Sequence, residues 1–429
     1  MNKNEYRRLK GFYENELTNQ ILSFWLPRCE DKEYGGYLNC FDNIGKRLVS
    51  YDKYTWSQGR FVWMFSRLAN TSAKIFSKEQ RKEFLRLAET GKDFLMKHCL
   101  MGEDDIRCVY LMERDGNPKY VSGYEALDMS IYADCFAVLA MAGYAAAAKD
   151  KESYEFGKKL YLSIVHRVET GEFHTLPYPL SRQYRAHGIP MILSNVTYEM
   201  YQAAILLEPE FCETLKISLV GYTEDILTHF ADENNVIHEV ITSENKPVDG
   251  LLGQHANPGH TIEDMWFMID AMDLLERPEW MEQITGIVKQ TLEIGWDKEF
   301  GGILHYAAVT GGCPKGDKKV PEEPTEKQVE DGWGDKLWWV HAEALYTTLL
   351  CYMRTEDKAF WNWHEKIFEY TFETFPNNDE QIREWIQIHK RNGEAEDKVV
   401  ALPVKDPFHI TRDLILILEL LEKVPDNLK

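Results

Sequence analysis

Apolar residues recur at helical spacing along most of the chain, in segments separated by clusters of Gly, Pro and Asn. This pattern predicts about twelve helices. They are expected near residues 5–28, 56–71, 78–98, 124–148, 151–168, 188–206, 210–231, 259–276, 279–294, 333–354, 357–374 and 406–423.

The predicted helices form a repeat. Every second helix starts roughly 70 residues after the previous one, so a pair of helices recurs about six times. Repeated units of this kind bury one another's apolar faces. The sequence therefore predicts an all-α fold in which six helical hairpins close into a toroid, the (α/α)6 barrel, as a single domain over residues 1–429.

Two loops, one in each half of the chain, are near copies of each other. They read "DKEYGGYLNCFDNIGK" from Asp31 and "DKEFGGILHYAAVTGG" from Asp297. A Gly pair between an acidic turn and a β-prone run predicts a short β-hairpin at one end of the barrel. The charged, Pro-bearing stretch over residues 315–335 is expected to be a long surface loop.

Unusual polar side chains lie at the starts of every second predicted helix. They are Trp56 and Arg60 in the second helix, His187 before the sixth, His260 and Glu263 in the eighth, His341 and Glu343 in the tenth, and His409 in the twelfth. Alternate helices of a toroid are parallel and form its inner ring, so their N-termini converge at one mouth. Each of these histidines alone would more often be a structural residue. Their coincidence at one mouth favours a site.

Helical geometry indicates which of these side chains share a face. Trp339 and Glu343 are four residues apart and lie on one face, whereas His341 points away from Glu343, so only one of His341 and Glu343 reaches the cavity easily. His260 and Glu263 share a face in the same way.

The spacing of Trp56, Arg60 and Trp63 places a guanidinium between two indoles. The alternative for this arginine is an ion pair with a nearby carboxylate such as Asp52.

Composition and charge narrow the range of partners. The net charge is −21, which argues against nucleic acid and anionic membrane surfaces, since both require a basic patch. Eight scattered cysteines without a CxxC pair predict reduced thiols and no metal site. No signal peptide and no uninterrupted run of about 18 apolar residues is evident. A soluble cytoplasmic protein is therefore expected.

The residues at the mouth suit proton transfer on a neutral polar ligand. Imidazole titrates near neutrality and can both remove and return a proton. Removal of a proton next to a carbonyl builds charge on the carbonyl oxygen, and a fixed arginine can stabilise that charge. Aromatic residues make up 13% of the chain, and indole faces stack on sugar rings. Neither a P-loop nor a GxGxxG motif after a strand is present, so a bound nucleotide has no support in the sequence.

The ordered motifs resemble those of the N-acylglucosamine 2-epimerase family over nearly the whole chain. They are "EYGGYLNCFDNIGK", "YTWSQGRFVWMFSRL", "NPGHTIEDMWFM", "DKEFGGILHY", "KLWWVHAEAL" and "DPFHITRDL". The resemblance implies an (α/α)6 barrel in which His260 and His409 are the acid–base pair, Arg60 stabilises an enolate, and Glu343 is a further catalytic residue. Glu263 is expected to orient a histidine or bind a sugar hydroxyl.

The implied reaction is epimerisation at C2 of an N-acyl-D-glucosamine or N-acyl-D-mannosamine through an enolate, without a required cofactor. Trp56, Trp339 and His187 are expected to bind the sugar. Some members of the family are activated by nucleotides such as ATP, and the sequence does not locate a site for one. Members often form homodimers.

Other functions stay open at this point. Related enzymes epimerise unmodified sugars such as mannose, glucose or cellobiose, or isomerise an aldose to a ketose. An inverting glycoside hydrolase on the same fold would use two carboxylates, for which Glu263 and Glu343 are candidates. A non-catalytic sugar-binding or protein-binding member is a further alternative.

Overall fold

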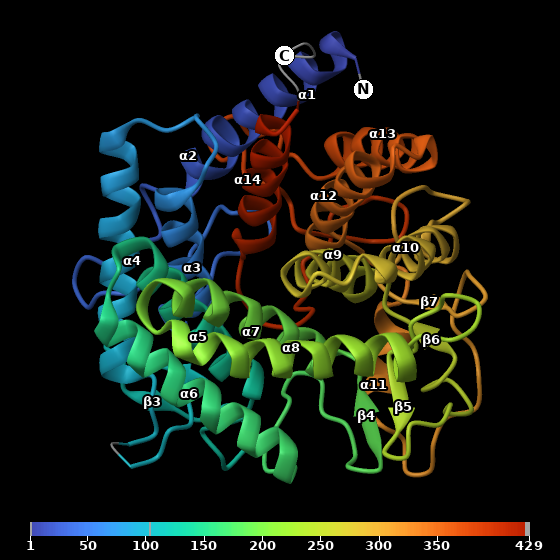
Figure 1. Ribbon diagram of the computed structural model, residues 1–429, viewed down its shortest axis with the longest axis horizontal. Helices are drawn as coiled ribbons and strands as arrows, with labels where there is room; N and C mark the ends of the chain where they lie inside the picture. Colours follow the sequence, from blue (N-terminus) through green and yellow to red (C-terminus); the bar gives the residue numbers. More distant parts are fainter. Residues whose placement is uncertain (1, 103, 425–429) are drawn as a thin grey trace.

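The predicted ring of inner helices is present. The structure is a computed structural model that describes residues 2–102 and 104–424. The inner helices are α3 (Thr55–Asn70), α5 (Ile131–Ala148), α7 (Gly188–Leu207), α9 (Pro258–Leu275), α12 (Trp338–Thr355) and α14 (Phe408–Glu422). Each packs against the next, and α14 packs against α3, which closes the ring (Figure 1).

An outer layer of helices surrounds this ring. The outer helices are α4 (Lys78–His98), α6 (Lys151–Thr170), α8 (Cys212–Asp225), α10 (Met281–Gly295) and α13 (Lys358–Thr374), with short helical turns η2 (Pro209–Phe211) and η3 (Ile226–Phe230) at the ends of α8 and η4 (Pro278–Trp280) before α10. The sixth outer helix comes from the N-terminal end of the chain as α1 (Lys3–Asn15), a π-helical turn η1 (Glu16–Ile21) and α2 (Leu22–Trp25), and α1 and η1 pack on α14. The fold is therefore the predicted (α/α)6 barrel.

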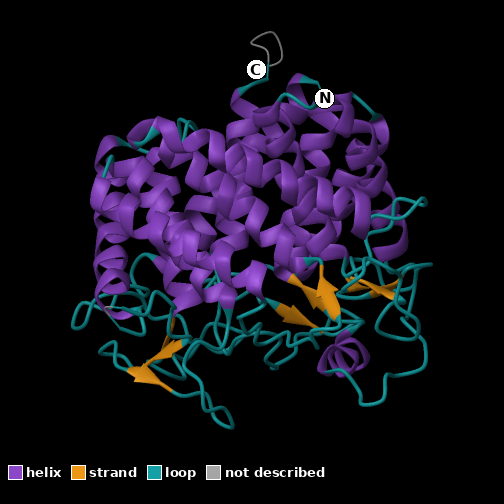
Figure 2. Ribbon diagram, turned by 60° about the horizontal axis from the view of Figure 1, so that its bottom comes forward, coloured by secondary structure: helices purple, strands orange, loops and turns teal. Residues whose placement is uncertain are grey.

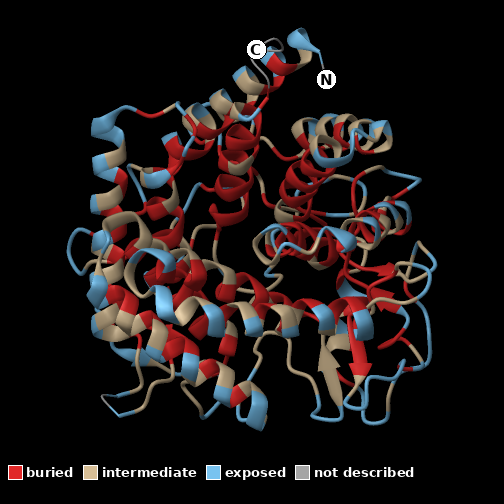
Figure 3. Cartoon of the chain, in the orientation of Figure 1, coloured by how far each residue is buried: buried red, intermediate tan, exposed pale blue. Residues whose placement is uncertain are grey.

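Burial follows the two layers. The inner helices are buried on most sides, whereas the outer helices expose one side to solvent (Figure 3). Helix α5 is long and apolar enough by composition to cross a membrane, but 78% of it is buried inside the protein. Asp134 within α5 is paired with Arg167 of α6, so this helix is part of the core.

Short antiparallel strands lie at one end of the barrel (Figure 2). They are β1 (Lys53–Tyr54), β2 (Leu111–Met112) and β3 (Pro118–Lys119) in one sheet, and the pairs β4 (Tyr184–Ala186) with β5 (Val240–Thr242), β6 (His255–Ala256) with β7 (Ala307–Ala308), and β8 (Lys336–Leu337) with β9 (Ile388–His389). Strands β1, β4, β6 and β8 lead directly into inner helices. These ladders therefore fix where the N-termini of those helices lie.

The two similar loops carry the same arrangement of charges. Asp31 accepts hydrogen bonds from Lys53 Nζ at 3.0 Å and Arg114 Nη2 at 2.9 Å. In the other half, Asp297 accepts from Lys336 Nζ at 3.1 Å and from Arg391. Across each of these turns the predicted hairpin consists of a single bridge, Glu30 with Tyr37 and Trp296 with Ile303, and each aspartate also accepts a backbone N–H within its own turn. The near copy in sequence is thus a repeated anchor for two strands that precede inner helices.

Some predicted boundaries were wrong. The helix expected from residue 124 begins at Ile131, because Ser130 is extended and pairs with Thr175. The stretch over 315–335, expected to be a loop, contains the helix α11 (Pro324–Gly332). Its proline occupies the first helical turn, where no backbone N–H is required, and Glu323 caps its N-terminus.

Candidate active site

The N-termini of the inner helices surround one cavity. Its walls are formed by Trp56, Arg60, Tyr132, Phe136, Tyr178, Gly188, Met191, Ile192, Asn195, His260, Glu263, Phe267, Trp338, Trp339, Ala401, His409 and Arg412. All six inner helices contribute to it. Of the residues predicted from the sequence, Trp56, Arg60, His260, Glu263, Trp339 and His409 line the cavity, whereas Glu343 and His187 lie behind its wall.

His409 is held from behind by a buried carboxylate. Its Nδ1 donates to Glu343 Oε1 at 2.6 Å, and the other oxygen of Glu343 accepts from Trp266 Nε1 at 2.8 Å. This leaves Nε2 of His409 as the nitrogen available to a ligand in the cavity. Burial lowers the pKa of His409 well below its usual range. His409 is therefore a neutral imidazole at neutral pH, which is the form of a proton acceptor.

Arg412 balances the charges beneath His409. Its Nη2 contacts both Glu263 and Glu343. These two carboxylates and His409 bring their ligand atoms within 4.8 Å of one another, as in a metal site. The guanidinium supplies the countercharge that such a group of donors requires. An inverting glycosidase pair is not supported, because both carboxylates bind Arg412 and their oxygens lie within 4.8 Å of each other, closer than the roughly 6.5–9.5 Å of such a pair.

His260 has a carboxylate partner that the sequence did not reveal. Its Nδ1 donates to Glu239 Oε1 at 2.8 Å, so Nε2 is again the nitrogen left for the cavity. The "NPGH" motif positions this histidine. Asn257 caps α9 by accepting the N–H of His260 at 3.2 Å, and a Cβ on Gly259 would lie 2.4 Å from the ring of Trp339. Gly at this position lets α9 approach the indole closely.

Trp339 lies between the two imidazoles. Its ring centroid is 5.7 Å from that of His260 and 5.4 Å from that of His409. Two imidazoles with separate carboxylate partners therefore flank one indole in one cavity.

His187 does not line the cavity. It is fully buried behind His260, where its Nε2 donates to Asp264 Oδ2 at 2.8 Å and its Nδ1 lies 3.6 Å from Glu239 Oε2. Burial alone would lower the pKa of His187, but the hydrogen bond to Asp264 and the nearby charge of Glu239 outweigh it and raise the pKa to about 9. The structure therefore places this residue among the supports of His260 and not in the cavity wall.

Arg60 lies among aromatic rings, with its guanidinium carbon 5.3 Å from the ring centroid of Trp56 as predicted, but the other rings are phenylalanines and not Trp63. Its guanidinium carbon is 4.3 Å from the ring centroid of Phe136 and 4.9 Å from that of Phe408. Nη1 is paired with Asp406, and the buried Nε has no hydrogen-bond partner in the protein. Arg60 thus keeps donor capacity for a ligand. The suggested partner Asp52 instead binds Lys119 Nζ at 2.8 Å.

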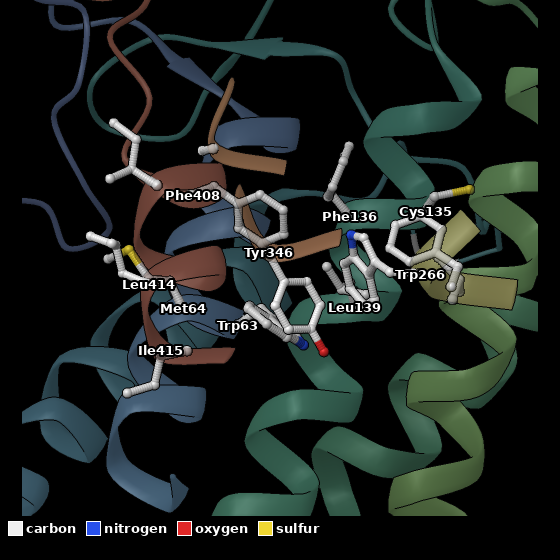
Figure 4. Packing of buried hydrophobic residues seen from close by; sticks show 14 of the residues in the cluster. Trp63, Met64, Cys135, Phe136, Leu139, Trp266, Tyr346, Phe408, Leu414 and Ile415 are labelled. Atoms are coloured by element: carbon white, nitrogen blue, oxygen red, sulfur yellow. The ribbon is translucent and has the colours of Figure 1, made fainter. Parts of the chain in front are cut away.

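A cluster of aromatic rings packs behind the residues that line the cavity, with Arg412 over two of these rings. Trp63, Trp266, Tyr346 and Phe408 come together from four inner helices (Figure 4). The ring centroids of Trp266 and Tyr346 are 5.4 Å apart, and those of Trp63 and Phe408 are 5.3 Å apart. Trp63 therefore lies one turn deeper than Arg60 and packs below the site.

His341 points away from the cavity, as its helical position predicted. It is fully buried, its Nδ1 donates to the carbonyl of Leu337 at 2.8 Å, and its Nε2 accepts the N–H of Ile303 at 2.9 Å. Both nitrogens are therefore used to join α12 to the repeated loop at Asp297. Burial lowers the pKa of His341 to about 3.

His341 makes stability depend on pH. An unfolded chain protonates this residue near pH 6.5, whereas the folded chain does so only near pH 3, so stability falls as pH decreases between these values. The loss is about 1.4 kcal/mol per pH unit. Urea unfolding at pH 6.5 and at pH 4.5 measures this loss. In His341→Gln, we expect the unfolding free energy to fall less between these two values, by about 1.4 kcal/mol for each pH unit. The exposed His174→Gln is the control, and an unchanged slope in His341→Gln would contradict the assignment.

The fold and the site together define a class: an (α/α)6-barrel protein with two carboxylate-bound imidazoles in one cavity at the N-termini of its inner helices. A family model described as N-acylglucosamine 2-epimerase (GlcNAc 2-epimerase) matches residues 36–411. The chain therefore belongs to the N-acylglucosamine 2-epimerase family, a family of sugar epimerases and isomerases.

Relatives of known activity support this assignment. The chain is 28% identical to the N-acylglucosamine 2-epimerase of Mus musculus over 94% of its own length and 89% of that protein. It is 23% identical to the cellobiose 2-epimerase of Dictyoglomus turgidum over 82% of its length and 83% of that protein. A solved cellobiose 2-epimerase from Bacillus thermoamylovorans shares the fold, with a TM-score of 0.76 and 18% identity over 97% of this chain and 100% of that one.

Proposed function

We propose that this protein interconverts N-acyl-D-glucosamine and N-acyl-D-mannosamine at C2. One observation carries the proposal: His260 and His409 flank Trp339 in one cavity, each with its Nδ1 on a carboxylate. Two such imidazoles can act on opposite faces of one carbon, as inversion at C2 requires.

The reaction runs through the open-chain sugar, whose C1 is a carbonyl. One imidazole Nε2 takes the C2 proton, and the electron pair of the broken C–H bond moves into a C1–C2 double bond as the carbonyl becomes an enolate. Arg60 stabilises the negative oxygen with its positive charge and its unpaired Nε–H. The other imidazole, as imidazolium, then delivers a proton to the opposite face of C2. Glu239 stabilises the imidazolium form of His260 and Glu343 that of His409, and the two histidines exchange the roles of acid and base between the forward and the reverse reaction.

The N-acyl substrate is favoured over an unmodified sugar by two observations. The relatives with the higher identity and coverage are N-acylglucosamine 2-epimerases. The wall of the cavity formed by α7 combines apolar Met191 and Ile192 with the amide of Asn195. Such a wall can bury the methyl group of an acetamido substituent and hydrogen-bond its amide.

Proton NMR in deuterated water tests the proposal. Incubation with N-acetylmannosamine should yield N-acetylglucosamine deuterated at C2. Separate samples with and without ATP compare the rates of this conversion. If N-acetylmannosamine stays unchanged while mannose, glucose or cellobiose exchanges its C2 proton, the N-acyl substrate is wrong and the acid–base site stands. Appearance of a ketose would identify an isomerase instead.

A further inference from the structure

His260 is supported by a chain of three buried residues that reaches away from the cavity. Glu239 accepts a hydrogen bond from the Nδ1 of His260, and His187 lies behind Glu239. Asp264 in turn accepts a hydrogen bond from His187. We propose that Glu239, held in place by His187 and Asp264, is a positioning residue for His260 alone, so that proton transfer at one face of C2 depends on it and transfer at the other face does not. This inference rests on the proposed two-histidine reaction.

The backbone fixes Glu239 beside His187. Strand β4 pairs with β5 in the register Ala186 to Val240, and the chain continues this pairing by one residue. The N–H of His187 therefore donates to the carbonyl of Glu239 at 2.9 Å. Because β4 leads directly into α7 and Glu239 directly precedes β5, the carboxylate is placed by two elements at once.

The charges behind Glu239 favour its ionised form. Burial would raise the pKa of Glu239, but the charges of His260 and His187 and the hydrogen bond with His260 hold it well below its usual range. His187 is fully buried, and Asp264, also fully buried, accepts its Nε2–H. A cation at His187 thus lies between two carboxylates. Without it, Glu239 would be a buried charge whose only close partner is His260.

His260 needs such a support more than His409 does. The side chain of His260 is 22% exposed, whereas that of His409 is 6% exposed and is enclosed by its neighbours. The hydrogen bond to Glu239 sets which nitrogen of His260 carries the proton and keeps Nε2 free for the cavity. The negative charge also stabilises the imidazolium that forms when His260 accepts a proton.

The support of His409 is separate. The charge of Glu343 is balanced by Arg412, a permanent cation. The charged residues near His409 are Glu343, Glu263, Arg412 and Asp413, and none of them belongs to the set of Glu239, His187 and Asp264 that supports His260. The two faces of the substrate therefore depend on two different sets of buried charges. Removal of one set should leave chemistry at the other face in place.

Glu239→Gln and Glu239→Ala test this separation. Gln keeps an oxygen that can accept the Nδ1–H and loses the charge, whereas Ala loses both. Each variant is mixed in deuterated water with each epimer in turn, and NMR follows exchange at C2 and conversion separately. We expect conversion to fall by about 10- to 100-fold, more in the Ala variant, with KM changed less than about threefold.

The pattern between epimers is the decisive result. From the epimer whose C2 proton faces His409, both variants should still exchange that proton with solvent, with retention of configuration, while conversion is lost. From the other epimer, exchange and conversion should fall together. Glu343→Gln is the matched variant at the other face and should show the reverse pattern. Equal losses from both epimers in the Glu239 variants, or no loss, would overturn the proposal.

A second measurement does not depend on turnover. Histidine side-chain 1H–15N spectra should show His260 protonated at Nδ1 in the unmodified protein and mainly at Nε2 in Glu239→Ala, with His409 unchanged. An unchanged His260 spectrum would overturn the positioning role. If the unmodified protein acts on another aldose, the proposed substrate fails, and the same exchange test on that aldose still decides the role of Glu239.

Discussion

Replacement of His409 by Asn is expected to lower kcat by about 10³-fold or more while the fold is retained. In the proposed reaction its neutral imidazole accepts a proton at Nε2, and asparagine has no group that can do so. Asn can still donate an N–H toward Glu343, so the buried carboxylate keeps a partner and stability changes little. The measurement is C2 conversion by NMR, with circular dichroism melting as the check of folding.

The same loss is expected for His260→Asn, because inversion needs a proton donor on each face of C2. His174→Asn serves as the control, since its side chain is 54% exposed and its Nδ1 contacts only Asp128 among the described residues, the carbonyl at 3.1 Å and the carboxylate at 4.0 Å. Activity near that of the unmodified protein in either site variant would end the two-histidine mechanism. If the loss of activity is accompanied by a large fall in melting temperature, the histidine stabilises the fold instead.

The barrel could be predicted because its cause lies in the sequence pattern. Helical periodicity gave the inner and outer helices, and their regular recurrence gave the closed ring, since each hairpin must bury its apolar face on the next. The boundary that failed at α5 depends on a contact from elsewhere in the chain. Ser130 pairs with Thr175 in place of starting a helix. Helix α11 is a different failure, since a proline at the first helical position is itself a local start signal, which the charged composition of this stretch outweighed.

The site could be predicted only in part for a similar reason. His260, His409 and Arg60 lie at the starts of inner helices, where position along the chain indicates position in the barrel. Arg412 follows His409 by three residues on the same helix face, so periodicity could have identified it. Glu239 and Asp406 lie in loops. Their side chains reach the site through strand pairing and tertiary contacts that no local spacing records.

Arg412→Met is expected to destabilise the protein by about 3–5 kcal/mol, because it leaves buried carboxylates without their cation. Arg412 is 3% exposed, its Nη2 contacts Glu263 and Glu343, and its guanidinium carbon lies 5.0 Å from the ring centroid of Trp266. Methionine fills much of the same space, so the loss reports the charge more than the packing. Urea unfolding measures it.

The pH dependence of that loss distinguishes charge from packing. Without Arg412, the buried carboxylates lose the charge that stabilises their ionised form, so the free-energy cost of keeping them ionised grows as pH increases. The deficit of Arg412→Met relative to the unmodified protein should therefore grow from pH 5 to pH 8. Arg67→Met removes a pair with Glu419 in which the arginine side chain is 31% exposed, and it should cost less and show a weaker pH dependence. A deficit for Arg412→Met that is constant with pH would mean that lost packing, and not the unbalanced carboxylates, is its cause.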